Sequence, residues 1–281
     1  MHIQARGLKF TADITGPESG ELVVFLHGFP QTKYTWRAEL TAIAALGYRC
    51  CAYDQRGYSQ GARPTDIDAY RPEEMIADTI AIAAHLGYER FHLVGHDWGG
   101  QIAWCIGALH EERVASLSVI SRPHPAAFIQ ALVNDPAQSR RSGHHQKFQD
   151  LGVADKLLAD DAAELRQIYG QWGGVPVDDA AAYLSTLGNR AALNAAINWY
   201  RAVGDTTIDF AALPSIKVPT LYVWGTGDTT VGKIAAEGTA ERVVGRFQFA
   251  QLPGVGHFVT DEVPGQFTHL LGTHLRSIDT I

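Results

Sequence analysis

The sequence predicts an α/β fold with a mostly parallel central sheet, flanking helices and an inserted helical cap. Short, continuous apolar runs recur along the chain, as at 22–26 and 220–224, and such runs are typical of strands buried on both faces of a parallel sheet. Stretches with apolar residues at helical spacing lie between most of these runs, which indicates alternating strands and helices. Between about 122 and 213 only helical patterning remains, so this part is expected to be an insertion.

The predicted elements follow in order along the chain. Residues 3–14 alternate loosely around Gly7, which predicts a hairpin. Buried strands are then predicted at 22–26, 48–53, 91–94, 117–120 and 220–224. Helices are predicted between them at 36–45, 73–86 and 101–109. Pro72 suits the first turn of the second helix, because the N–H that proline lacks would have no partner there.

Helix-breaking residues divide the insertion into several helices; they are Pro136, Gly152, Gly173-Gly174 and Gly188. The predicted boundaries are a first core part at 1–122, a cap at 123–213 and a second core part at 214–281. We expect the cap to cover the carboxyl ends of the strands, because ligands bind there in sheets of this kind.

Composition limits the partners and the compartment. Hydrophobic residues make up 46% and charged residues 19% of the chain, as in ordinary globular proteins, and a net charge of -7 provides no basic surface for nucleic acid or anionic lipid. The chain starts without a signal-peptide pattern and has no apolar run long enough for a bilayer, so a cytoplasmic location is expected. Cys50, Cys51 and Cys105 lack metal-ligand spacing and are expected to be buried thiols.

The sharpest chemical signal is GHDWGG at 95–100, between a predicted strand and a predicted helix. Small residues on both sides of Asp97 indicate a cramped strand-turn-helix elbow, with Asp where esterases place a serine nucleophile. A carboxylate is already charged at neutral pH and can attack a saturated carbon that bears a leaving group, such as an epoxide oxygen or a halide. The alternative is that Asp97 only caps the helix that follows.

Three further positions complete a candidate site. In HGFP at 27–30, the backbone N–H of Phe29 is expected to form an oxyanion hole with that of Trp98, and Pro30 suits a rigid turn with a possible cis bond before it. Asp228 follows a predicted strand, and His257 lies in a Gly-rich loop downstream. The order nucleophile, acid, base predicts that Asp228 orients His257, which activates water as the general base.

These motifs, with DQRGYS at 54–59, resemble the epoxide hydrolase branch of the α/β-hydrolase superfamily, close to the haloalkane dehalogenases. The resemblance covers nearly the whole chain and implies the α/β-hydrolase fold with its helical cap. It also implies an enzyme that converts a small apolar epoxide and water into a vicinal diol through an ester on Asp97. No metal and no other cofactor is implied, and the oligomeric state stays open.

Members of this branch hold the epoxide oxygen with two cap phenols. The motif NWYR at 198–201 resembles the second of these sites, which implies that Tyr200 is the acid that opens the ring. The first site should lie near SGHHQKF at 142–148, where no tyrosine is present and His144 occupies the matching position. Tyr169 is a less closely matching candidate for this first site. For both Tyr169 and Tyr200, the alternative is that the side chain only packs between cap and core.

The sequence leaves two alternatives to an epoxide hydrolase open, a haloalkane dehalogenase and a ligand-binding receptor. Haloalkane dehalogenases use a tryptophan beside the nucleophile to bind halide, and Trp98 stands there, although many epoxide hydrolases share it. Fluoroacetate dehalogenases resemble a different elbow with two arginines, where this chain has Trp98 and Gln101, so a carboxylate-bearing substrate is not expected. A ligand-binding receptor would tolerate a broken triad, whereas this triad is complete.

Overall fold

The strands pair into one eight-stranded sheet in the order β1-β2-β4-β3-β5-β6-β7-β8. The computed structural model describes residues 1–278, so the last three residues of the predicted second core part lie outside the described residues. The strands are β1 (His2–Ala5), β2 (Leu8–Thr15), β3 (Leu22–Leu26), β4 (Arg49–Tyr53), β5 (Phe91–His96), β6 (Val114–Ile120), β7 (Thr220–Gly225) and β8 (Phe247–Leu252). The β1–β2 and β2–β4 pairs are antiparallel and the others parallel, which confirms the predicted α/β fold.

Among the strands of the described residues, β8 is the one that the sequence did not predict. It is the edge strand beside β7, and Gln248 and Gln251 are exposed while Leu252 alone is buried. An edge strand covered on one side lacks the continuous apolar run by which the central strands were predicted.

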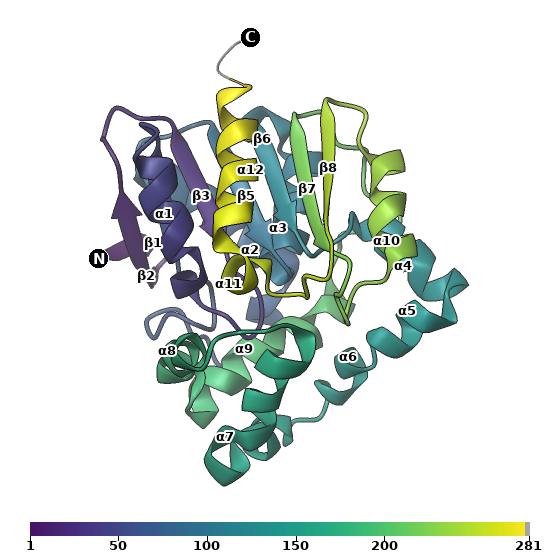
Figure 1. The fold of residues 1–281 in the computed structure, drawn as a ribbon. Coiled ribbons are helices and arrows are strands. Elements are labelled where there is room, and N and C mark those ends of the chain that lie inside the picture. Colours follow the sequence, from purple (N-terminus) through teal and green to yellow (C-terminus); the bar gives the residue numbers. More distant parts are fainter. Residues whose placement is uncertain (279–281) are drawn as a thin grey trace.

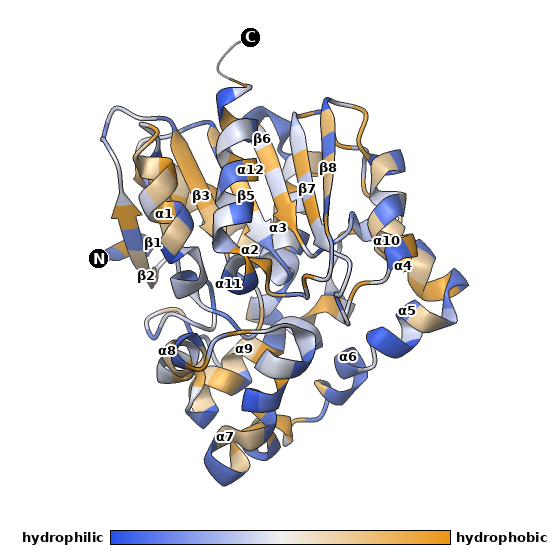
Figure 2. Ribbon diagram, in the orientation of Figure 1, coloured by the Kyte–Doolittle hydropathy of each residue, from blue (hydrophilic) through white to orange (hydrophobic). Residues whose placement is uncertain are grey.

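The core lies in two layers, one on each face of the sheet (Figure 1). Along β3, Val23 and Phe25 belong to the cluster that contains apolar residues of α1 (Arg37–Ala44) and α12 (Pro264–Arg276). Val24 belongs to the other cluster, with residues of α2 (Pro72–His85) and α3 (Trp98–Leu109). Alternate residues of a strand point to opposite faces of the sheet. A strand that is apolar at every position, such as β3 with its orange colour in Figure 2, is therefore buried on both faces.

A proline marks the start of one flanking helix, and the turn at Asp97 marks the start of another. Helix α2 (Pro72–His85) starts at the predicted proline, and α3 (Trp98–Leu109) starts directly after Asp97, three residues before the predicted start. The second core part contributes two further short helices, α10 (Lys233–Gly238) and α11 (Val259–Glu262).

Six helices of the inserted segment extend from the carboxyl ends of the strands (Figure 1). They are α4 (Pro125–Asn134), α5 (Pro136–Arg141), α6 (His144–Lys147), α7 (Val153–Trp172), α8 (Val177–Leu187) and α9 (Arg190–Ala202). Their ends agree with the predicted breaks: Pro136 begins α5, Gly152 precedes α7, Gly173 follows it and Gly188 follows α8. Residues 159–162 have non-helical backbone angles and bend α7.

Helix α9 is anchored to the DQRGYS turn of the core. The indole N–H of Trp199 donates to the carbonyl of Arg56 at 2.8 Å, and two bonds of 2.7 Å tie the Arg56 guanidinium to the Asp78 carboxylate. At Gly57, where φ is +94°, a Cβ would lie 2.9 Å from the carbonyl oxygen of Ala195. Glycine at position 57 therefore allows α9 to approach the turn closely. Tyr200, which follows Trp199 on this helix, is thereby held over the ends of the strands.

The three cysteines are buried and unpaired, as predicted. Burial raises the pKa of each thiol to about 12, so they are unreactive at neutral pH. Among residues 1–278, no helix combines the length and apolar character that a bilayer span requires.

Candidate active site

Asp97 occupies the turn between β5 and α3 with a strained backbone. Its φ of 49° lies in a region that residues with a Cβ rarely adopt. A Cβ at Gly99 would lie 2.1 Å from the carbonyl oxygen of Leu26, so only glycine lets the helix begin this close to β3. The Asp97 side chain makes no capping hydrogen bond to α3. The structure thus disfavours the reading of Asp97 as a helix cap and leaves its carboxylate available.

The loop after β3 contributes a hydrogen-bond donor to this carboxylate. The backbone N–H of Phe29 donates to Asp97 Oδ1 at 2.9 Å, and the Phe29–Pro30 peptide bond is cis. The side chain of Gln55 holds the loop by donating to the carbonyl of His27 at 2.6 Å. Trp98 is the first residue of α3, so its N–H has no partner within the helix. One predicted donor of the oxyanion hole therefore contacts the carboxylate, and the other begins the adjoining helix.

The imidazole of His257 links the two predicted acids. Its Nδ1 lies 2.8 Å from Asp228 Oδ2, and its Nε2 lies 3.5 Å from Asp97 Oδ2. The other oxygen of Asp228 accepts hydrogen bonds from the backbone N–H groups of Thr230 and Val231, at 2.7 and 3.0 Å. Asp228 is thus a fixed acceptor that orients the imidazole toward Asp97, and the three predicted residues come together.

The charges of this triad are strongly coupled. Burial would raise the pKa of Asp97, but the positive charge of His257, whose Nε2 lies 3.5 Å from Oδ2, holds it well below its usual range. Burial would likewise lower the pKa of His257, yet the charge and hydrogen bond of Asp228, together with Asp97, raise it to about 10. The acidic neighbours therefore favour the protonated form of the His257 imidazole.

Removing the charge of Asp97 should release the proton of His257. In an Asp97→Asn variant we expect the pKa of His257 to fall from its value of about 10, because an amide does not stabilise the imidazolium as a carboxylate does. NMR titration of the His257 ring in both proteins measures this change. An unchanged pKa would show that Asp228 alone holds the proton.

Tyr200 lies buried over the elbow, within an aromatic cluster. Its ring is perpendicular to those of Trp98 and Phe29, at centroid distances of 5.0 and 5.5 Å. Burial and the nearby charge of Asp97 raise the pKa of Tyr200 well above its ordinary value, while interaction with Trp98 works against that rise. The phenol therefore keeps its proton at neutral pH and can donate it or a hydrogen bond.

Two histidines of α6 contact Tyr200, where the sequence analysis singled out one. The ring centroids of His144 and His145 lie 5.9 and 5.2 Å from that of Tyr200. Burial lowers the pKa of His144 to about 4 and that of His145 to about 3, so both rings are neutral. His144 packs against Trp172, at 4.7 Å, and His145 stacks on Trp98, at 6.5 Å. Each ring could offer one N–H to a ligand beside Tyr200.

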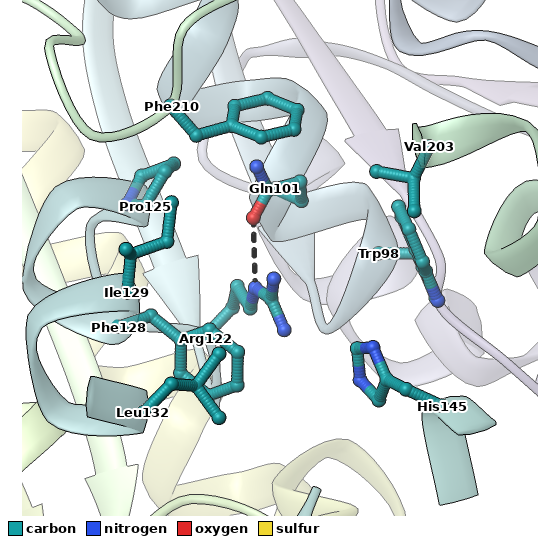
Figure 3. A pocket seen from close by; sticks show the side chains of 10 residues that line it. All are labelled: Trp98, Gln101, Arg122, Pro125, Phe128, Ile129, Leu132, His145, Val203 and Phe210. Atoms are coloured by element: carbon teal, nitrogen blue, oxygen red, sulfur yellow. Dashed lines mark hydrogen bonds between the residues drawn. The ribbon is translucent and has the colours of Figure 1, made fainter. Parts of the chain in front are cut away.

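Three apolar side chains line a cavity beside the nucleophile elbow, whereas Tyr169 holds a loop. Phe128, Ile129 and Leu132 line an apolar cavity beside Trp98 (Figure 3). The hydroxyl of Tyr169 donates to the carbonyl of Pro30 at 2.9 Å, which is the structural role considered above. Arg122 also lines the cavity and was missed; its signal in the sequence was a charged residue just past the carboxyl end of a buried strand.

Comparison with known proteins shows which family this chain resembles in sequence and in fold. The family model described as alpha/beta hydrolase fold matches residues 21–264. Epoxide hydrolase A of Mycobacterium tuberculosis is 30% identical, over 99% of this chain and 97% of its own length. Epoxide hydrolase 4 of Mus musculus is 31% identical, over 98% and 79%. A variant of an epoxide hydrolase from Bacillus megaterium superimposes with a TM-score of 0.88 and 26% identity, over 98% of this chain and 100% of its own.

Proposed function

Since the chain belongs to the α/β-hydrolase fold family, among relatives that are epoxide hydrolases, we propose that it converts epoxides into vicinal diols through a covalent ester on Asp97. The observation that carries the proposal is the setting of this carboxylate. Its Oδ1 accepts the N–H of Phe29, its Oδ2 faces His257, and the phenol of Tyr200 lies buried beside it.

The first step is attack on an epoxide carbon by Asp97 Oδ2, the oxygen that Phe29 does not hold. As the carbon–oxygen bond of the ring breaks, the leaving oxygen takes a proton from Tyr200, assisted by a hydrogen bond from His144. The products are a β-hydroxyalkyl ester on Asp97 and a phenolate. Esterification removes the charge of Asp97, so the pKa of His257 falls and its proton restores the phenol.

In the second step, neutral His257 accepts a proton from water, which attacks the carbonyl carbon of the ester. The oxyanion that forms on Oδ1 is stabilised by the N–H groups of Phe29 and Trp98. Collapse of this intermediate releases the diol, whose new oxygen comes from Asp97, and leaves the oxygen of water in the carboxyl group. His257 gives the proton it accepted to the leaving oxygen of the diol and then takes the proton of the new carboxyl group of Asp97, so the resting ion pair is restored.

Haloalkane dehalogenation is the second candidate, because Trp98 lies directly beside the nucleophile. A halide needs N–H donors at the leaving-group position rather than a proton. The close pairing of the Trp98 ring with Tyr200 favours the epoxide, since a buried phenol next to Asp97 serves a leaving alkoxide. A panel of epoxides and haloalkanes, scored for diol and halide together, separates the two: diol without halide supports the proposal, and halide without diol overturns it.

A single turnover in ¹⁸O-water tests the covalent ester. With enzyme in excess over an epoxide, we expect the diol to contain no ¹⁸O and the label to appear in the peptide that contains Asp97. Direct attack of water on the epoxide would instead give labelled diol and unlabelled peptide. A second turnover by the labelled enzyme in ordinary water should then transfer the label to the diol.

A further inference from the structure

Arg122 is a cation placed at the same edge of the sheet as the nucleophile. It follows the carboxyl end of β6, the neighbour of β5, which leads to Asp97. Ser121, directly before it, is buried and has a φ of 53°, a strained angle for serine. Backbone strain beside an active site is retained where it positions a functional group. The Arg122 side chain that follows reaches Gln101 of α3.

The guanidinium of Arg122 is largely enclosed but forms no ion pair with a carboxylate among residues 1–278. Its single described side-chain hydrogen bond runs from Nε to Gln101 Oε1, at 2.9 Å. Its carbon Cζ lies 4.2 Å above the ring of Phe128 and 5.9 Å from that of Trp98. Aromatic faces stabilise a cation only modestly. A shielded arginine normally has an anionic partner, because an unpaired charge is costly to remove from water.

The two Nη groups of Arg122 face a cavity of about 130 Å³ (Figure 3). Its walls are otherwise apolar or neutral, with Phe128 and Ile129 on one side and Trp98 and His145 on the other. Among the described residues that line it, Arg122 alone carries a charge. Trp98 borders the cavity and directly follows the nucleophile, so the cavity adjoins the active site.

We propose that this cavity binds the carboxylate of an epoxy acid, with Arg122 as the anchor, while the oxirane lies at Asp97 and an apolar linker passes Trp98. The proposal rests on the function proposed above and specifies its substrate class. It differs from the prediction made from the sequence, in which a carboxylate-bearing substrate was not expected. That prediction depended on Trp98 and Gln101, which stand where fluoroacetate dehalogenases have two arginines. Instead the cation comes from the neighbouring strand, and Gln101 holds it by its Nε.

The reaction cycle gives the charge of such a substrate a role. In the free enzyme the carboxylate of Asp97 stabilises Arg122 from a distance. Esterification removes that negative charge from the surroundings of the guanidinium. A substrate carboxylate on Arg122 would keep it paired through the intermediate, and a charged bidentate contact is geometrically well suited to arginine.

The simpler reading is that Arg122 acts only through Asp97, by keeping that carboxylate ionised. The two roles differ in their dependence on substrate charge. If Arg122 acts only through the nucleophile, its removal slows acidic and neutral epoxides equally. If it binds the substrate, its removal raises KM for the acid alone and leaves neutral epoxides with unchanged kcat and KM.

Binding of an unreactive probe tests the site independently of catalysis. We expect 4-phenylbutanoate to bind the wild-type protein roughly 10- to 100-fold more tightly than 4-phenylbutanamide in isothermal titration calorimetry, the range typical of a charged hydrogen bond. Arg122→Gln should abolish the difference. Lys147→Gln, which removes an exposed positive charge on α6 away from this cavity, should preserve it. Equal binding of acid and amide by the wild-type protein would overturn the proposal.

Kinetics on terminal epoxides with a carboxylate two to eight methylene groups away complete the test. The wild-type enzyme should prefer one chain length as the acid over its methyl ester, by roughly 10- to 100-fold in kcat/KM, and Arg122→Gln should lose that preference. Turnover of esters and acids at equal rates would refute the anion site but leave epoxide hydrolysis intact. Formation of no diol from any epoxide would instead refute the proposed function, and the calorimetry would then decide on the anion site alone.

Discussion

Replacement of His257 by glutamine is expected to trap the enzyme as its ester. Glutamine can still donate a hydrogen bond to Asp228, which lies 2.8 Å from Nδ1 in the wild type, but it cannot accept a proton from water. Attack by Asp97 on the epoxide does not need the base, so the first step should continue. Hydrolysis of the ester should slow by roughly 100- to 10,000-fold, the usual contribution of a general base.

Intact-protein mass spectrometry checks this result. After mixing with a terminal epoxide, the variant should accumulate a species heavier by the mass of one substrate molecule, and peptide mapping should locate it on Asp97. His269→Gln, at an exposed position of α12, is the matched control and should show turnover without accumulation. Normal turnover by His257→Gln would remove the residue from the mechanism.

Replacement of Tyr200 by phenylalanine has the second largest expected effect, and it falls on the other half-reaction. The ring would keep its contacts with Trp98, Phe29 and Phe148, so the fold should be preserved. Without the phenol, the alkoxide must leave unprotonated, and ring opening should slow by roughly 100-fold or more. Pre-steady-state measurement of ester formation isolates this step.

A matched control is available within the core. Tyr222 on β7 is also fully buried, and its hydroxyl has no hydrogen-bond partner within the part of the chain that the structure describes, so Tyr222→Phe should leave ester formation unchanged. His144→Gln and His145→Gln then show which histidine assists: the one that contributes should slow ring opening as well. If Tyr200→Phe forms the ester at the wild-type rate, Tyr200 has only a packing role.

The sequence alone determined the features that depend on neighbours along the chain. The apolar runs predicted the buried strands because strands covered on both faces must be apolar at every position. The elbow could be predicted because its glycines and Asp97 lie within six consecutive residues, where the turn constrains all of them. Asp228 and His257 followed because each comes at the carboxyl end of a strand or in the loop after it, and those ends meet at one edge of a parallel sheet.

Only the tertiary structure decided which side chains meet across segments that are distant in sequence. It showed that both His144 and His145 contact Tyr200, and that Trp199 anchors α9 to the core through the carbonyl of Arg56. It also placed Arg122 in an apolar cavity without a carboxylate partner among the described residues. The physical reason is that burial and pairing of a charge depend on the elements packed around it, which no local pattern of residues records.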